Sequence, residues 1–229
     1  MRLPRTLKSK RAVINLIAHN NSKSPITEKY RLIRNNLQFS SIDKDIKSIV
    51  VTSPEPSDGK STTSANLAIV LAQQGKKVLL VDADLRKPSV HYAFNLSNTE
   101  GLTSVLTKKI SLKQAIQITS IPNLAILTSG QIPPNPYQLL DSEAMQVLIK
   151  VLNTGFEYVI YDTPPILAAT DSQIIANKCD GVILVVASGK TRKEVALKSK
   201  VVLENANAQL LGVVVNGVDS NNETYYQYG

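Results

Sequence analysis

Gly59, Lys60 and Ser61 stand in succession in this 229-residue chain, and their types and order suggest chemistry on a phosphate group. They follow a turn-rich segment and open a helical pattern of apolar residues, so they would lie at the start of a helix. Backbone N–H groups at such a start attract anions, and a glycine lets the backbone pass close to a phosphate. The Lys60 ammonium would lie between the β- and γ-phosphates, the Ser61 hydroxyl would ligate Mg²⁺, and Thr62 would lie near the α-phosphate. These residues predict a nucleoside triphosphate site.

The loop before Gly59 is an imperfect match to the phosphate-loop pattern Gly-x-x-x-x-Gly-Lys-Ser/Thr, because Ser53 replaces the first glycine and the spacing differs. A Gly-Lys-Ser triplet also arises by chance, and a solvated helix start is the alternative interpretation. The apolar strand before the loop and the helix after it favour a nucleotide site. The loop residues Ser57 and Asp58 belong to the predicted nucleotide-binding set.

Three aspartates follow apolar runs further along the chain: Asp82, Asp84 and Asp162. The carboxyl ends of parallel strands meet at one edge of a sheet, so these carboxylates would gather where the triphosphate binds. Asp82 is placed to accept a proton from an attacking hydroxyl or to hold the metal, and Asp84 could share either role. Asp162 resembles a Walker B aspartate, which supports Mg²⁺. A single aspartate at a strand end is usually a cap or turn residue, but three of them beside a Gly-Lys-Ser loop favour a functional site. The predicted catalytic residues are Lys60, Asp82, Asp84 and Asp162, and the predicted metal ligands are Ser61, Asp82 and Asp162.

Alternating strands and helices must position these residues. The expected strands are 48–53, 77–82, 124–128, 158–162, 181–187 and 211–216, and the expected helices are 60–74, 136–152, 171–177 and 191–205. Gly75 and Gly155 mark helix ends, and Thr191 with Glu194 predicts a capping box. Continuous apolar strands are typical of a parallel sheet that is covered on both faces. The predicted fold is therefore an α/β, P-loop NTPase-like, doubly wound, mainly parallel sheet with helices on both faces.

Composition narrows the class further. The chain has 26 lysines and arginines against 18 acidic residues, a net charge of +8, and much of the excess precedes Glu28. Such a basic arm could meet anionic lipid, nucleic acid or an acidic partner, or could be a solvated tail. Cys179 is the single cysteine, which excludes an internal disulfide framework, and it is expected to pack rather than react. We find no secretory signal and no run long enough to span a membrane, and expect a cytoplasmic protein.

The chain resembles the bacterial tyrosine kinases (BY-kinases) of capsule and exopolysaccharide systems from about Glu28 to its last residue. The motifs that carry the resemblance are Thr52-Ser53 with Gly59-Lys60-Ser61 (Walker A), 81–88 (Walker A′), 159–165 (Walker B), Glu28-x-x-Arg31-x-x-Arg34, 130–136, and the terminal Tyr225, Tyr226 and Tyr228. Together these motifs are highly specific, whereas singly only Walker A′ is. The implied organisation is a basic arm (1–24), a kinase domain (25–217) and a tyrosine-rich tail (218–229).

The resemblance implies ATP- and Mg²⁺-dependent phosphorylation of protein tyrosines, including the three in the tail, which regulates capsule or exopolysaccharide synthesis. It implies that Asp82 is the base, that Asn216 contacts adenine, and that Glu28, Arg31 and Arg34 form a ring-like homo-oligomer. The implied partners are the cytoplasmic end of a separate membrane adaptor, tyrosine-bearing protein substrates and a cognate phosphatase. Nucleic acid is not expected, and the adaptor would hold the kinase at the inner face of the cell membrane.

Other interpretations remain open. Asn216 could be an ordinary turn residue, the face of Glu28, Arg31 and Arg34 could be solvated, and the tail could be a partly packed aromatic segment. Ser57 stands where BY-kinases more often carry glycine, which could strain the turn. The main alternative function is an ATPase switch of the partition or septum-placement type, but that class carries a lysine early in the loop and this loop has none before Lys60. A small-molecule kinase and a non-enzymatic scaffold are the remaining alternatives.

Overall fold

The computed structural model describes residues 14–40 and 45–218. Within them, seven strands form one sheet in the order β3-β4-β2-β5-β1-β6-β7. The strands are β1 (Ser48–Thr52), β2 (Val78–Asp82), β3 (Gln117–Ile118), β4 (Leu124–Leu127), β5 (Tyr158–Asp162), β6 (Gly181–Ala187) and β7 (Leu210–Asn216). All neighbouring pairs are parallel except β3 with β4. The predicted α/β, mainly parallel fold is confirmed.

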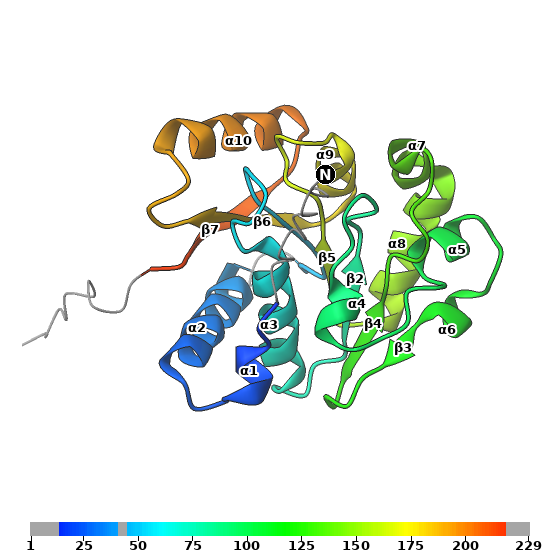
Figure 1. Cartoon of the computed structure of the whole chain (residues 1–229), viewed down its shortest axis with the longest axis horizontal. Coiled ribbons are helices and arrows are strands. Elements are labelled where there is room, and N and C mark those ends of the chain that lie inside the picture. The colour runs from blue at the N-terminus through cyan, green and yellow to red at the C-terminus, as the bar shows by residue number, and fades with distance from the viewer. Residues whose placement is uncertain (1–13, 41–44, 219–229) are drawn as a thin grey trace, which may run out of the picture.

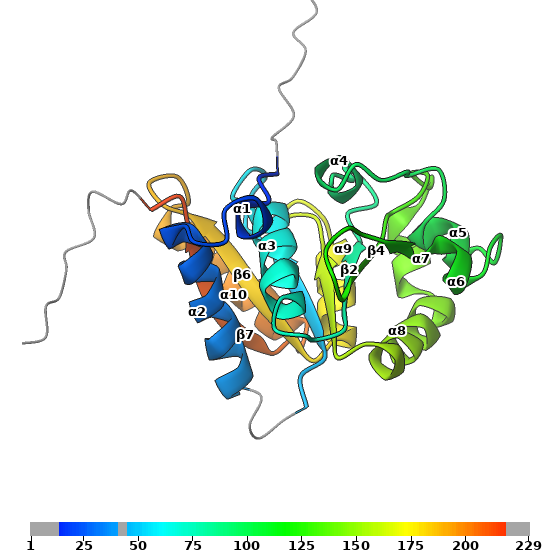
Figure 2. The same cartoon turned by 90° about the horizontal axis from the view of Figure 1, so that it is seen from below.

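Helices cover both faces of the sheet (Figure 1). They are α1 (Ile17–Asn20), α2 (Pro25–Ser40), α3 (Lys60–Ala72), α4 (Val90–Ala93), α5 (Leu102–Leu106), α6 (Leu112–Ala115), α7 (Pro136–Asp141), α8 (Glu143–Gly155), α9 (Asp171–Lys178) and α10 (Lys193–Asn205). Helix α3 packs on β1, β2 and β5, with α1 and α2 beside it (Figure 2). On the opposite face, α9 contacts β1, α8 contacts β5 and α10 contacts β7.

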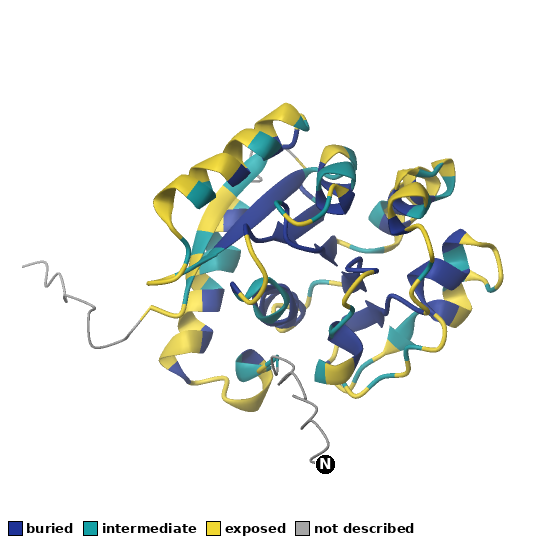
Figure 3. Cartoon of the chain, turned by 45° about the horizontal axis from the view of Figure 1, so that its top comes forward, coloured by how far each residue is buried: buried dark blue, intermediate teal, exposed yellow. Residues whose placement is uncertain are grey.

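The central strands are buried because their apolar residues pack into clusters on both faces of the sheet. Val50 belongs to one apolar cluster, whereas its neighbours Ile49 and Val51 belong to a second cluster on the opposite face. All five residues of β1, β2 and β5 are buried, and Figure 3 shows these strands inside a shell of partly exposed helices. Burying continuous apolar strands on both faces is the packing expected of a parallel sheet. The result is a rigid platform that fixes where each strand ends.

Two local predictions are wrong. The apolar pattern of residues 136–152 is divided between α7 and α8, because Ser142 adopts an extended conformation and its hydroxyl accepts from the Met145 N–H at 3.3 Å. Thr191 does not cap α10. Its hydroxyl accepts from the Ala187 N–H at 2.9 Å, and the helix begins at Lys193 without a side-chain cap. The short elements β3, α1, α4, α5 and α6 were not anticipated from the sequence.

Residues 14–24, which fall inside the predicted basic arm, pack against α3. Ala18 is fully buried, and its N–H donates to Asn66 Oδ1 at 2.9 Å. Asn66 Nδ2 in turn donates to the Asn15 carbonyl at 2.8 Å. One buried asparagine therefore holds this segment to the helix that follows the phosphate loop.

The structure bears on the cysteine and on the expected lack of a membrane span. Cys179 packs against the apolar cluster beneath β6, and burial raises the pKa of its thiol, so the prediction of a packing role is confirmed. Among the described residues, no helix combines the length and the apolar character that a bilayer span requires.

Candidate active site

Three neighbouring strands of the sheet end together and bring the predicted residues to one place. β5 lies between β1 and β2, and Asp82 at the end of β2 is directly in register with Asp162 at the end of β5. The phosphate loop (residues 53–59) leaves the end of β1 and leads into α3. We call this side of the sheet, where β1, β2 and β5 end, the carboxyl edge, and the side where they begin the amino edge. The predicted gathering of carboxylates at the phosphate loop is confirmed.

A side chain at Gly59 would strain the backbone and displace Asn216. The φ of Gly59 is +102°, in the left-handed region, and a Cβ there would lie 2.0 Å from Asn216 Nδ2. Asn216, at the end of β7, donates from that nitrogen to the Asp58 carbonyl at 3.0 Å. The last strand of the sheet therefore packs directly on the phosphate loop, where Gly59 leaves room for it.

Ser57 adopts a φ of +65°, in the left-handed region. This conformation costs most L-residues roughly 1–2 kcal/mol, whereas glycine and, to a lesser extent, asparagine tolerate it. This backbone conformation accounts for the strain expected at a serine in this position. Asp58, the next residue, is fully buried, and its carboxylate accepts from the Glu55 N–H at 3.0 Å. The Asp58 side chain is thus used within the loop.

Lys60 lies among carboxylates. Its Nζ is 3.1 Å from Asp84 Oδ2, 3.8 Å from Asp162 Oδ2 and 3.0 Å from the Ser61 hydroxyl oxygen. Burial works against the charged form of Lys60, but Asp162 and Asp84 outweigh it and raise the pKa of its ammonium. Lys60 is therefore a permanent cation held at the start of α3.

Asp82 is the most strongly perturbed carboxyl of the site. It is fully buried, and Oδ2 accepts from the N–H groups of Ser89 and Val90, both at 3.0 Å. Burial and the neighbouring Asp162 raise the pKa of the Asp82 carboxyl to about 7, against the opposing effects of the Val90 N–H and Lys60. A carboxyl with such a pKa can take up a proton near neutral pH.

Asp162 has one satisfied oxygen and one that is available. Ser64 donates its hydroxyl to Oδ1 at 2.9 Å, whereas Oδ2 is buried and accepts no hydrogen bond from the described residues. Burial raises the pKa of this carboxyl, and Lys60 and Ser61 oppose that rise. An available buried carboxylate oxygen close to the Ser61 hydroxyl fits Mg²⁺, which prefers oxygen ligands.

The described side chains of this site do not by themselves surround a metal ion. Within residues 14–40 and 45–218, no three or more histidine, cysteine, aspartate or glutamate side chains are arranged to hold an ion. Magnesium in nucleotide sites is typically held by one or two protein groups, by phosphate oxygens and by water. Ser61 and Asp162 are the residues that fit this limited role.

An ion pair that the sequence did not reveal ties the Walker A′ segment to α9. Arg86 donates from Nε and Nη2 to the two carboxylate oxygens of Asp171 at 2.8 and 3.0 Å. Asp84 Oδ1 accepts from the N–H groups of Arg86 and Lys87 at 3.3 and 2.9 Å. Arg86 stood in a recognised motif, but its partner 85 positions away became apparent only in the folded chain.

Other predicted residues lie elsewhere. Glu28, Arg31 and Arg34 share α2, where Arg31 pairs with Glu28 and Arg34 Nη1 donates to the Val70 carbonyl at 3.3 Å. They are not part of the carboxylate cluster. Thr62 lies in the first turn of α3 and is half-buried. Tyr225, Tyr226 and Tyr228 lie outside the described residues.

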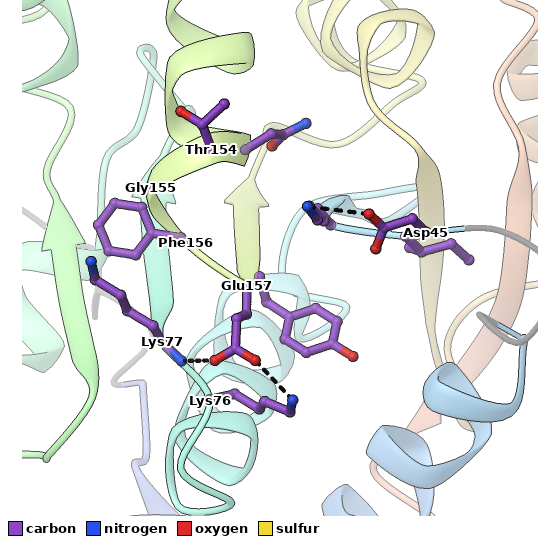
Figure 4. A pocket seen from close by; sticks show the side chains of 11 residues that line it. Asp45, Lys76, Lys77, Thr154, Gly155, Phe156 and Glu157 are labelled. Atoms are coloured by element: carbon purple, nitrogen blue, oxygen red, sulfur yellow. Dashed lines mark hydrogen bonds and ion pairs between the residues drawn. The ribbon is translucent and has the colours of Figure 1, made fainter.

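A hollow of about 510 Å³ lies at the amino edge, away from these groups (Figure 4). Glu157 lies between two lysines there: Lys76 Nζ donates to it at 2.8 Å and the Lys77 N–H at 2.9 Å. The hydrogen bond from Lys76 lowers the pKa of the Glu157 carboxyl. Lys77 Nζ lies 5.3 Å from the centre of the Phe156 ring. The Glu157 carboxylate in this hollow is exposed and already paired with Lys76, so it offers no unpaired charge to a ligand.

The strand order, the phosphate loop after β1 and the aspartates after β2 and β5 define a P-loop NTPase-like domain. The family described as the AAA domain matches residues 46–194. The tyrosine-protein kinase YwqD of Bacillus subtilis (strain 168) is 53% identical over 214 residues, covering 93% of this chain and 90% of that protein.

Solved structures agree with this relationship. The chimerical protein CapA2B2 is 44% identical with a TM-score of 0.85, over 89% of this chain and 93% of that one. The kinase domain of Escherichia coli tyrosine kinase ETK is 33% identical with a TM-score of 0.88, over 99% and 89% of the two chains. The chain belongs to the bacterial tyrosine-protein kinases.

The switch-type ATPases share the core fold at lower similarity. The septum site-determining protein MinD of Pyrococcus horikoshii, solved with Mg-ADP, is 26% identical with a TM-score of 0.64, over 74% and 70% of the two chains. The kinases therefore match this chain in both sequence and fold more closely than the main alternative class does.

Proposed function

We propose that this tyrosine kinase transfers the γ-phosphoryl group of ATP to protein tyrosines, among them Tyr225, Tyr226 and Tyr228 of a neighbouring copy. The observation that supports this most directly is the position of Asp82. It is fully buried beside Asp162 at the carboxyl edge, and its pKa of about 7 suits a group that must accept a proton at neutral pH. A switch that only binds and hydrolyses ATP has no need of a base toward a tyrosine hydroxyl.

Each residue has a defined part in this proposal. Bound ATP with Mg²⁺ supplies the phosphoryl group and part of the charge stabilisation. Lys60 holds a positive charge at the start of α3, where the β- and γ-phosphates would lie, and the loop N–H groups around Gly59 and Ser61 orient them. Asp82 takes the proton from the tyrosine hydroxyl as its oxygen attacks.

The same geometry supports the proposed metal and nucleotide contacts. Ser61 and Asp162 would hold Mg²⁺, and Asp84 would keep Lys60 in place at 3.1 Å. Asn216, which packs on Gly59, is proposed to contact adenine. Transfer of the phosphoryl group needs a cation and a base at once. Lys60 supplies the cation, and the buried carboxylates Asp82 and Asp162 beside it supply the base and a metal ligand.

A phosphosite map tests the main proposal. The protein is incubated with ATP and Mg²⁺ and phosphotyrosine is located by mass spectrometry, with the triple variant Tyr225→Phe, Tyr226→Phe, Tyr228→Phe as control. We expect phosphate on the tail tyrosines of the wild type and none on the control tail. ATP turnover without any phosphotyrosine would instead indicate a switch ATPase. Mixing a Lys60→Met copy that bears the tail with an active copy that lacks it distinguishes transfer between subunits from transfer within one.

We propose that α2 mediates a ring-like homo-oligomer through Glu28, Arg31 and Arg34. The three side chains recur every third residue, so they fall on one side of the helix. The double variant Arg31→Ala, Arg34→Ala is expected to give a smaller particle by light scattering. Lys23→Ala, just before α2, is the control for loss of a positive charge outside the helix and should leave the mass unchanged. An unchanged mass for the double variant would refute this interface.

The remaining proposals concern partners and place. We propose that the cytoplasmic end of a membrane adaptor activates the kinase and holds it at the inner face of the membrane, that a phosphatase reverses the tail phosphorylation, and that the pair regulates capsule or exopolysaccharide synthesis. The family membership supports these assignments. Adding a candidate adaptor fragment should raise tail phosphorylation and recruit the kinase to adaptor-bearing vesicles, and no change in either would contradict the adaptor role.

A further inference from the structure

The phosphate loop contains a buried negative charge. Asp58 is fully buried and lies immediately before Gly59, in a loop whose N–H groups would face a triphosphate. An unbalanced carboxylate at this position would repel the phosphates that the loop must hold. Something in the fold must therefore neutralise Asp58.

Lys190 is placed to do this. It lies between β6 and α10, and its Nζ donates to Asp58 Oδ1 at 2.7 Å and to the Pro56 carbonyl at 2.6 Å. The other carboxylate oxygen, Oδ2, accepts from the Glu55 N–H at 3.0 Å. Lys190 is 46% exposed whereas Asp58 is not exposed at all, so the lysine covers the carboxylate from the solvent side. Asp58 belongs to the predicted phosphate loop, whereas no sequence motif marks Lys190.

We propose that Lys190 is a positioning residue for the nucleotide: it neutralises Asp58 and fixes the turn of the phosphate loop so that its N–H groups stay directed at the phosphates. This rests on the nucleotide site of the proposed function. This phosphate loop lacks the early lysine that switch ATPases carry. Lys190 reaches the loop from the connection between β6 and α10, where it neutralises Asp58 and does not contact the phosphate.

The loop geometry explains why such a clamp is needed. Ser57 is held at a φ of +65°, which the chain would relax if it were free to do so. Lys190 holds the carbonyl of Pro56 on one side of that residue and the carboxylate of Asp58 on the other. Asn216 Nδ2 fixes the Asp58 carbonyl at 3.0 Å. Two contacts from the β6–β7 side of the sheet therefore set the loop conformation.

Loss of Lys190 would leave a buried charge in the phosphate loop without its counter-ion. Without it, the carboxylate of Asp58 remains buried and unpaired, which is far more costly than removing both charges together. The loop would then either expose Asp58 or repel the triphosphate. Removing the Asp58 charge at the same time should cancel most of this cost, because water can replace the contact with the exposed Pro56 carbonyl.

Calorimetric titration with Mg-ADP tests this by affinity rather than activity. We expect Lys190→Met to weaken Mg-ADP binding by about ten-fold or more, as for truncation of one partner of a buried charge pair. Lys190→Arg should recover much of the affinity. The double variant Asp58→Asn, Lys190→Met should bind within about two-fold of Asp58→Asn alone, since the energies are coupled. Lys193→Met, three residues further on, is the matched control and should bind like the wild type.

Thermal unfolding without nucleotide separates positioning from mere stabilisation. A lowered unfolding midpoint of Lys190→Met with unchanged Mg-ADP affinity would overturn the proposal. If Lys190→Met does not fold, the single variant Asp58→Asn is compared with the double variant Asp58→Asn, Lys190→Met. A large further loss of Mg-ADP affinity in the double variant would contradict the neutralising role. A wild type that binds Mg-ADP through this clamp but forms no phosphotyrosine would leave this inference standing while the proposed kinase activity on the tail fails.

Discussion

At the amino edge of the sheet, charged side chains pair one to one in water, whereas at the carboxyl edge three buried aspartates share one lysine. Lys76 pairs with Glu157 and Lys47 with Asp45 at the amino edge, and these four side chains are between 37% and 81% exposed. At the carboxyl edge, Asp82, Asp84 and Asp162 are almost completely buried around Lys60. The same sheet therefore has one edge that is electrostatically balanced and one that is not.

This electrostatic difference, rather than the hollow at the amino edge, identifies the functional edge. The hollow of about 510 Å³ lies at the balanced edge, where solvent already screens each pair. At the other edge, burial and the neighbouring Asp162 raise the pKa of Asp82, and Oδ2 of Asp162 accepts no hydrogen bond from the described residues. A bound cation would relieve that imbalance, which is the condition under which a metal and a triphosphate bind tightly.

The largest effect should come from removing Lys60, the lysine that the three aspartates of the carboxyl edge share. Lys60→Met leaves the three aspartates without their shared lysine and removes the charge that would stabilise the transferring phosphoryl group. We expect tail phosphorylation to fall by roughly 10²–10³-fold or more, the range seen when one transition-state contact is lost. Quantitative mass spectrometry of the tail measures it. Lys76→Met, the matched lysine of the amino edge, should retain phosphorylation, and an equal loss in both variants would erase the distinction between the edges.

The sequence was sufficient for the parts of the site that follow from single strands. β1, β2 and β5 are continuous apolar runs, and the residue after each run must lie at the carboxyl edge, so Asp82 and Asp162 could be placed without coordinates. Their register, side by side on neighbouring strands, required the strand order. The order depends on packing between distant segments, which no local pattern encodes.

The features that could not be predicted depend either on which hydrogen-bond partner a side chain takes or on contacts between distant segments. Thr191 had the spacing of a helix cap, but the Ala187 N–H claimed its hydroxyl. Ser142 was hidden inside a helical apolar pattern and acts as a cap that divides it. Lys190 and Asp58 lie 132 positions apart and meet only because β6 and β1 are neighbours in the sheet.

The next effect concerns the pH dependence of stability at the carboxyl edge. Because burial raises the pKa of Asp82 to about 7, the folded protein binds this proton more tightly than the unfolded chain, whose aspartates have a pKa of about 3.9. The stability from this group is full below the unfolded pKa and is lost as the pH rises toward about 7. Asp82→Asn should therefore remove a decline of up to about 1.4 kcal/mol per pH unit in that window.

Urea unfolding of both proteins between about pH 5 and about pH 8, with EDTA and without nucleotide, measures this difference. Asp82→Asn should also lower the rate of tail phosphorylation by about 10²-fold or more, as for the loss of a general base. Glu157→Gln at the amino edge serves as control and should leave the pH profile of stability unchanged. If the free energy of unfolding changed with pH in the same way for the wild type and Asp82→Asn, Asp82 would not be the source of the pH dependence.

A smaller effect should come from backbone strain in the phosphate loop. Ser57→Gly relieves the positive φ of an exposed residue without removing a hydrogen bond of the loop, and we expect a gain of about 0.5–1 kcal/mol in the free energy of unfolding. Asn207→Gly, at a φ of +53°, is the control and should gain less, because asparagine tolerates the left-handed region. Chemical denaturation measures both variants. Equal gains at the two sites would mean that strain is not concentrated at the functional edge.

The smallest effect should be found at the balanced edge itself. Glu157→Gln removes an exposed charge whose partners, the Lys76 ammonium and the Lys77 N–H, can turn to water instead. We expect no resolvable shift in the unfolding midpoint and no change in tail phosphorylation. Asp84→Asn is the matched change at the carboxyl edge, and because Asp84 is buried against Lys60 it should alter both measurements. If Glu157→Gln perturbed the protein as much as Asp84→Asn, the amino edge would have to be more than a screened set of surface pairs, since only a buried or strained pair makes the loss of one charge costly.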